Sequence, residues 1–112
     1  MLPFLNRLKK EDFKLLKNFK KKFFVSDNIN LKLYYSGFNP SRFSVVVPTS
    51  FSKKATKRNK IKRQTKAALL NYLKKIEPGF ASVFYFKKET KNLSFEEIKK
   101  EILFLLKKSK IL

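Results

Sequence analysis

The most informative segment of the sequence is Lys53-Lys54-Ala55-Thr56-Lys57-Arg58-Asn59-Lys60-Ile61-Lys62-Arg63-Gln64-Thr65-Lys66. Eight of these fourteen residues are cationic and none is acidic. Small and apolar side chains recur through and beyond it at helical spacing, at Ile61, Thr65, Ala68, Leu69, Tyr72 and Ile76. The spacing predicts a long helix from residue 54 or 55 to residue 76, ended by Glu77-Pro78-Gly79 and packed on a core through this stripe.

The opposite face of this helix is predicted to be cationic. Asn59, Lys62, Arg63 and Lys66 fall together on it, with Arg58 on its flank. A merely solvated face is the ordinary explanation of a charge run, but such a face normally interleaves both signs of charge. Arginine can grip a phosphate with two hydrogen bonds and lysine acts as a mobile point charge, while asparagine can reach a ribose, a base edge or a hydrated metal ion. The face is therefore predicted to bind a phosphate backbone.

The composition of the whole chain agrees with a polyanionic partner. The 112 residues fit one domain spanning residues 1–112, and an apolar fraction of 43% allows a modest core. The formal net charge is +20, and no acid occurs between Asn28 and Ile76 against twelve cations there. Such self-repulsion destabilises a compact state unless a polyanion relieves it.

Several function classes are excluded by missing residues. The chain has no cysteine and no histidine, which removes disulfides, thiolate or histidine metal sites and the common nucleophile–histidine pairs. With Gly37 and Gly79 as its only glycines, it has no glycine-rich phosphate loop. We therefore predict no catalytic residue in the protein and assign no metal ligand.

Two acids have the spacing of a possible metal site. Glu97 and Glu101 lie one helical turn apart and could pair around a metal, but we expect them to interleave with Lys99, Lys100 and Lys107 on a solvated helix face.

No apolar run approaches the roughly 20 residues that cross a bilayer, and no apolar signal core follows the N-terminal cations. A cytoplasmic location is the expectation.

The N-terminal half is predicted to form a helix followed by strands. Apolar residues at helical intervals predict a first helix over residues 8–20. Residues 29–35 alternate, with Ile29, Leu31, Leu33 and Tyr35 on a dry face and Asn30, Lys32 and Tyr34 on a wet one. Residues 42–47 predict a second strand that forms a hairpin with the first, and residues 23–25 a short additional strand.

The C-terminal part is predicted to add a strand and a helix. Residues 80–86 predict the strand and residues 87–93 a loop. Ser94 and Glu97 form a capping box that opens the last helix, whose inward residues are Phe95, Ile98, Ile102, Leu105 and Leu106. The predicted order is helix, two or three strands, long basic helix, strand, helix.

The basic helix also resembles the signature of a known family, the protein component of bacterial ribonuclease P. The matching residues are Ala55, Arg58, Asn59, Lys60, Ile61, Lys62, Arg63, Thr65 and Lys66. Further similarity lies in Leu2-Pro3, in residues 6–13, in residues 31–35 and in Leu93-Ser94-Phe95-Glu96-Glu97. The resemblance implies a mixed α/β fold, an α+β two-layer sandwich with a left-handed crossover that departs from the usual right-handed rule.

The resemblance further implies a function. Members of this family join a catalytic RNA, and the complex removes the 5′ leader of precursor tRNA by chemistry that the RNA and its Mg²⁺ ions supply, the Mg²⁺ being held mainly by the RNA. The chain would then be the protein subunit of an endoribonuclease, with the catalytic RNA and precursor tRNA as partners and no protein or membrane partner required. The RNA-binding role passes to Lys53, Lys54, Lys57, Arg58, Asn59, Lys60, Lys62, Arg63 and Lys66. A cleft for the single-stranded leader would be lined by Phe13, Lys17, Lys32 and Tyr34, because aromatic faces suit unstacked bases.

Three points about these residues stay open. Phe13 fits a core position as well as the cleft, whereas the wet-face position of Tyr34 favours the cleft. Lys17 stands where the family often has a second helix aromatic, for which Phe19 or Leu16 can compensate. Pro48-Thr49-Ser50 replaces the family's Ser-Lys-Lys, and Lys53 and Lys54 are candidates to supply the missing charge.

Two other function classes are alternatives to this prediction. A ribosomal or other structural RNA-binding protein would share the charge but leaves the full basic-helix signature unexplained. A membrane-surface protein would use the basic amphipathic helix, although Ala68 and Thr65 make a poor lipid-inserting face. Only a ribonuclease P subunit is expected to restore precursor cleavage by a bacterial catalytic RNA at low Mg²⁺, which distinguishes it from a structural RNA-binding protein. Comparing liposome flotation with an RNA gel shift distinguishes an RNA-binding protein from a membrane-surface protein.

Overall fold

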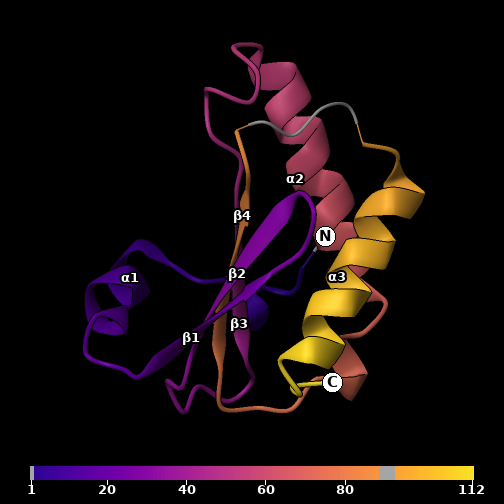
Figure 1. Cartoon of the computed structure of the whole chain (residues 1–112). Helices are drawn as coiled ribbons and strands as arrows, with labels where there is room; N and C mark the ends of the chain where they lie inside the picture. The colour runs from indigo at the N-terminus through magenta and orange to yellow at the C-terminus, as the bar shows by residue number, and fades with distance from the viewer. Residues whose placement is uncertain (1, 89–92) are drawn as a thin grey trace.

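The computed structural model describes residues 2–88 and 93–112, which form a four-stranded sheet with helices on both sides. Figure 1 shows α1 on one side of the sheet and α2 and α3 together on the other. In chain order the elements are α1 (Lys10–Leu16), β1 (Lys21–Val25), β2 (Ile29–Tyr34), β3 (Arg42–Val46), α2 (Ala55–Leu70), β4 (Ala81–Phe86) and α3 (Phe95–Lys108), with short 3₁₀ turns at Phe4–Asn6 and Leu73–Lys75. The mixed α+β class, the element order and the additional strand near residues 23–25 are confirmed.

The strand order of the sheet is β1-β2-β4-β3, so the predicted hairpin between β2 and β3 is wrong. β2 pairs antiparallel with β1 and with β4, while β3 pairs parallel with β4. The loop after β2 explains this: the N–H of Gly37 donates to the carbonyl of Gly79 at 2.8 Å, and the N–H of Gly79 donates to the carbonyl of Phe38 at 2.7 Å. These bonds hold the start of β4 beside the end of β2 and leave β3 on the outer side of β4. α2 is thus a crossover between parallel strands, the connection for which the resemblance predicts a left-handed path.

The main core lies between the sheet and the pair α2 and α3. Ile29, Leu31 and Leu33 of β2 and Phe84 of β4 are fully buried there. The predicted inward residues are confirmed, since Ile61, Thr65, Ala68 and Leu69 of α2 and Ile98, Ile102, Leu105 and Leu106 of α3 are buried. Tyr72, Ile76 and Phe95 are partly buried against the same core. Tyr35 is an exception to the predicted dry face, because β2 ends before it and its side chain is 40% exposed.

Two helices are shorter than predicted. α2 ends at Leu70 rather than at residue 76, because the chain tightens there: the N–H of Tyr72 donates to the carbonyl of Leu69, and a 3₁₀ turn follows. α1 covers residues 10–16 of the predicted 8–20, since Leu8 pairs in extended form with Phe43 and the carbonyl of Lys20 accepts from Tyr35 next to the β1–β2 ladder. Helical spacing of apolar residues does not by itself reveal such ends.

The predicted capping box of α3 is confirmed, but the prediction for Glu101 is wrong. Ser94 Oγ accepts from the N–H of Glu97, and the Glu97 carboxylate accepts from the N–H of Ser94. Glu101 does not sit on a solvated face: its carboxylate accepts hydrogen bonds from Ser26 Oγ at 2.5 Å and from the backbone N–H and the side-chain amide of Asn28 at 2.8 Å each. It ties the β1–β2 turn to α3 because that turn presents three donors within its reach.

Two predictions remain, one for the loop after β4 and one for membrane crossing. The predicted loop over residues 87–93 falls mainly on residues 89–92, which lie outside the described residues. None of the helices in the described part of the chain combines the length and the apolar character that a bilayer crossing requires.

Candidate nucleic-acid interface

The outer side of α2 carries the predicted cations. Asn59 and Arg63 are exposed, Lys62 and Lys66 are half-buried, and none of the four is a buried core residue. We call these four residues the cationic face. Lys53, Lys54, Lys57 and Lys60 are all exposed around it. The structure therefore brings the predicted RNA-binding residues together on and around one helix whose inner side is fixed in the core.

The cations of this helix have no acidic partner in the structure. Over residues 2–88 and 93–112 the one ion pair joins Arg42 to Asp12, both remote in sequence from α2. Arg58 is held instead by a backbone group, since its Nη1 donates to the carbonyl of Ser52 at 2.6 Å. That bond ties the first turn of α2 to the loop before it and leaves the positive charge of Arg58 uncompensated.

Arg7 belongs beside the cationic face, although the sequence did not place it there. Arg7, Arg63, Lys66 and Ala67 line a hollow of about 400 Å³, which we call the N-terminal hollow. The helical spacing of α2 assigned Arg63 and Lys66, but nothing in the sequence pattern brings a residue some fifty positions away next to them. The only available signal was the family-like segment that contains Arg7.

The α1 side of the sheet carries the residues predicted for the leader. Lys32 of β2 lies between two rings: its Nζ is 5.6 Å from the ring centre of Phe23 on β1 and 5.1 Å from that of Tyr85 on β4. The strand register sets Phe23 and Val83 opposite Lys32, with Tyr85 one row along. Phe23, Lys32, Tyr34 and Tyr85 are called the aromatic face below. Phe23 and Tyr85 were not among the predicted site residues, although the alternation of β1 and β4 could have placed them on this side.

The predicted site residues differ in their exposure on this side. Phe13 is 41% exposed on α1, so the core alternative for it is wrong, and Lys17 is exposed at the end of the same helix. Tyr34 lies on the predicted side of β2 but is only 7% exposed, so the expectation of a wet position is wrong. It packs with Leu16, Ala81 and Val83 in a second apolar cluster, which alternation alone could not reveal.

Tyr34 also influences its neighbour. Burial raises the pKa of the Tyr85 phenol above its ordinary value, and the nearby Tyr34 adds to the increase. The Tyr85 phenol therefore stays neutral at physiological pH and can donate or accept hydrogen bonds. The two residues suggested as substitutes for the missing helix aromatic are taken up by packing: Leu16 is buried and Phe19 meets Phe38 edge-on at 6.2 Å between ring centres.

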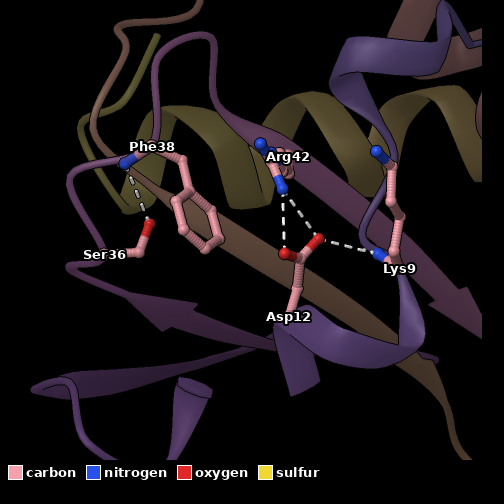
Figure 2. A network of polar contacts seen from close by, with 5 residues as sticks. All are labelled: Lys9, Asp12, Ser36, Phe38 and Arg42. Carbon is pink, nitrogen blue, oxygen red and sulfur yellow. Dashed lines mark hydrogen bonds and ion pairs between the residues drawn. The ribbon is translucent and has the colours of Figure 1, made fainter. Parts of the chain in front are cut away.

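An ion pair fixes α1 over the sheet (Figure 2). Arg42 Nη1 of β3 donates to both carboxylate oxygens of Asp12, at 2.8 and 2.9 Å, and the N–H of Lys9 donates to Oδ2 at 2.8 Å. The guanidinium carbon of Arg42 also lies 4.6 Å from the ring centre of Phe38. Burial by itself would raise the pKa of the Asp12 carboxyl, but the Lys9 hydrogen bond, the Arg42 hydrogen bonds and the charges of Arg42 and Lys9 together lower it. Asp12 thus anchors the helix that presents Phe13.

Asp12→Asn is expected to lower the free energy of unfolding by about 2 kcal/mol at pH 7, because Arg42 loses a buried charged partner. A carboxyl whose pKa is lowered on folding stabilises the fold above its unfolded pKa, here near 3.8, and loses that contribution as the pH falls through the lowered value. Urea unfolding should therefore give the same difference between the proteins at pH 7 and pH 5 and a shrinking one below pH 3.8. The exposed Asp27→Asn is the control; a difference that does not change with pH would contradict the assignment.

The loop before α2 contains Pro48-Thr49-Ser50, the segment that departs from the family pattern. Pro48, Thr49 and Ser50 form a turn in which the carbonyl of Pro48 accepts from the N–H of Phe51. Lys53 and Lys54 follow it and are exposed, so their charges are available where the family-like lysines are missing. No group of three or more metal-ligating side chains occurs among the described residues.

Comparison with known proteins gives a consistent match over the whole fold. The family model described as Ribonuclease P matches residues 2–110. The chain is 32% identical to the ribonuclease P protein component of Rippkaea orientalis, over 99% of this chain and 91% of that protein. It is 30% identical to that of Microcystis aeruginosa, over 99% and 96%.

Solved structures give the same match in three dimensions. The RNase P protein from Thermotoga maritima is similar with a TM-score of 0.77 and 28% identity, covering 91% of this chain and 96% of that one. The RNase P protein of Staphylococcus aureus, at 18% identity, shares the fold with a TM-score of 0.78 over 95% and 96% of the two chains.

Proposed function

Since the chain belongs to the ribonuclease P protein family, we propose that its cationic face binds the catalytic RNA of ribonuclease P and that its aromatic face, together with Phe13 of α1, receives the 5′ leader of precursor tRNA. The family membership itself makes the protein a subunit of the ribonuclease that processes the 5′ end of tRNA, and makes its partner an RNA. The identity of each RNA at each surface is the proposal. Its site of action in the cell is proposed to be the cytoplasm.

One observation carries the proposal for the catalytic RNA. The cationic face is uncompensated by any acid in the described part of the chain, and its helix is locked to the core through Ile61, Thr65, Ala68 and Leu69. Lysines and arginines held on a rigid helix neutralise phosphates without first having to be ordered, and they release the counterions of the RNA on binding. Lys53, Lys54, Lys57, Arg58 and Lys60 extend the surface toward the loop before α2.

The side chains of this surface do not fit a Mg²⁺ site of their own. Mg²⁺ prefers oxygen ligands in octahedral geometry, whereas the cationic face offers ammonium and guanidinium groups and the single amide oxygen of Asn59. We therefore propose that the Mg²⁺ needed for cleavage is held mainly by the RNA. The protein contributes charge neutralisation and positioning, in keeping with its lack of histidine and cysteine.

The α1 side supports leader binding through stacking and charge. Phe13 and Phe23 expose 41% and 59% of their surface, and the Lys32 ammonium stands between the rings of Phe23 and Tyr85. Unpaired bases stack on such rings, and an ammonium between them can meet a leader phosphate. Tyr34 supports this surface from below, and Lys17 adds an exposed cation at the end of α1.

Phe13→Ala is expected to weaken binding of precursor tRNA to the protein–RNA complex about tenfold, since stacking of one base contributes about 1–3 kcal/mol. Binding of mature tRNA, which has no leader, should stay within twofold. Leu15→Ala is the matched control, because Leu15 is 48% exposed on the same helix but points about 200° away around its axis. An equal loss for both tRNAs would remove Phe13 from the leader contact.

Reconstitution tests the function as a whole. The purified protein is added to a bacterial ribonuclease P RNA at a Mg²⁺ concentration too low for the RNA to cleave precursor tRNA alone. The proposal predicts that 5′ cleavage is restored at the correct phosphodiester. A ribosomal or other structural RNA-binding protein would bind RNA in a gel shift without restoring cleavage, and that result would refute the proposal.

A further inference from the structure

The N-terminal hollow lies between the N-terminal segment and α2. Arg7 comes from the extended segment before α1, whereas Arg63 and Lys66 come from the middle of α2. Ala67, the fourth residue that lines the hollow, leaves room between them because it has no side chain beyond Cβ. Three cationic side chains from two distant segments therefore surround about 400 Å³ of open space, and none of the described residues that line it is acidic.

Arg7 is held in place by the protein itself. Its Nε donates to the carbonyl of Leu2 at 2.8 Å, and Leu2 is buried in the main core with 1% exposure. The backbone beside it is fixed as well, since Arg7 bridges to Phe43 of β3 and the N–H of Leu8 donates to the carbonyl of Phe43. The Asn6 amide adds a hydrogen bond to the carbonyl of Ser41 at 2.9 Å. The segment that carries Arg7 is thus anchored at both sides.

This anchoring determines which part of Arg7 can bind a ligand. Its Nε is used inside the protein, so the two terminal nitrogens of the guanidinium provide the outward donors. A guanidinium edge matches two oxygens of a phosphate, and its preorganisation reduces the entropy lost on binding. Keeping three cations around one hollow costs electrostatic free energy in the free protein, which an anion in the hollow would relieve.

We infer that the N-terminal hollow is a phosphate-binding site in which Arg7, Arg63 and Lys66 together hold one phosphodiester of the catalytic RNA. Arg7 is the new member of the RNA-binding set, and it makes the N-terminal segment part of the RNA interface. The identity of the RNA rests on the proposed function, whereas the phosphate site itself does not.

Inorganic phosphate probes the site without any RNA. The chain has four arginines, at positions 7, 42, 58 and 63, so their side-chain N–H signals can be followed separately by NMR. Titration with phosphate should move the signals of Arg7 and Arg63 along a saturable curve. Arg42, which is paired with Asp12, serves as the internal reference and should move little. Equal, unsaturated movement of all four signals would mean that phosphate only joins the general ion atmosphere, and would overturn the inference.

Two variants separate the site from the fold. Arg7→Gln should reduce the response of Arg63 several-fold. Ala67→Leu keeps every charge and the Arg7–Leu2 bond but fills the hollow, and it should have the same effect. An Arg63 response that survives in the folded Ala67→Leu protein, as judged by its thermal melt, would contradict a site in the hollow.

The salt dependence of RNA binding identifies the source of the phosphate. Arg7→Gln should lower the log–log slope for the catalytic RNA by about one unit, while Lys107→Gln on α3 should leave it unchanged. Precursor tRNA binding to the assembled complex should keep its slope in both. A loss of slope for precursor tRNA alone would assign the phosphate to the substrate and contradict the inference. Failure of wild-type protein to restore cleavage would instead refute the proposed function and leave the phosphate titration unaffected.

Discussion

Replacing Lys62, Arg63 and Lys66 together with glutamine is expected to weaken binding of the catalytic RNA about 10²-fold at 0.15 M salt. Each lost phosphate contact lowers the slope of log K against log salt by about 0.9, so the slope should fall by about 3 units. The three residues lie on the outer side of α2 and none of them is buried in the core, so the fold should persist. Filter binding between 0.1 and 0.5 M salt measures both quantities.

The control for this variant removes the same charge from another helix. Lys100, Lys107 and Lys108 are exposed on α3, and their replacement by glutamine also lowers the net charge by three. A general attraction between a basic protein and RNA would make the two triple variants equally weak. Such equality would contradict a defined interface on α2, whereas a slope change confined to the α2 variant supports it.

Phe84→Ala is expected to lower the free energy of unfolding by about 3–5 kcal/mol, because it removes a fully buried ring and leaves a cavity. Phe84 lies on the central strand β4, opposite Leu31 of β2 and Val45 of β3, with α2 and α3 above it. Few neighbouring groups can shift to fill the gap, since the strands on both sides are held by the sheet. Urea unfolding at pH 7 measures the change.

Phe104→Ala is the matched control for the core variant. Phe104 is 49% exposed on α3, so its removal should cost no more than a few tenths of a kcal/mol. If both variants lost similar stability, the main core would not lie between the sheet and the pair α2 and α3.

Local periodicity predicted the elements of this fold well but not their neighbours. The stripe of α2 and the capping box at Ser94 were visible because residues three or four apart share a helix face. The pairing of β2 with β4 instead depends on hydrogen bonds between Gly37, Phe38 and Gly79, which lie about forty positions apart. Alternation in β2 and β3 is compatible with a hairpin and with the observed order, so the sequence pattern could not choose between them.

In the candidate site, too, the features of single elements could be predicted and the contacts between elements could not. The cationic residues of α2 could be predicted because they lie on one helix, and the resemblance added their partner. Tyr34 was placed on the correct side of its strand, but its burial depends on Leu16 of α1, which covers it from another element. Arg7 meets Arg63 and Lys66 only through the packing of the N-terminal segment against β3. Contacts between distant segments are set by tertiary structure. The hydrogen bond from the Asn28 N–H of the β1–β2 turn to Glu101 of α3 is a further example.

Directed cleavage of the catalytic RNA from α2 shows whether the cationic face lies against that RNA. The chain has no cysteine, so Leu70→Cys and Lys107→Cys each create one attachment point for an iron chelate that generates hydroxyl radicals. Leu70 is 43% exposed at the end of α2 and points in the same direction as Arg63 and Lys66, and its replacement keeps every cation of the cationic face and leaves the lining of the N-terminal hollow unchanged. A defined interface on α2 predicts strong, localised cuts in the catalytic RNA from position 70 and only background cleavage from position 107. Equal cleavage from both positions, or cleavage from position 107 alone, would contradict it.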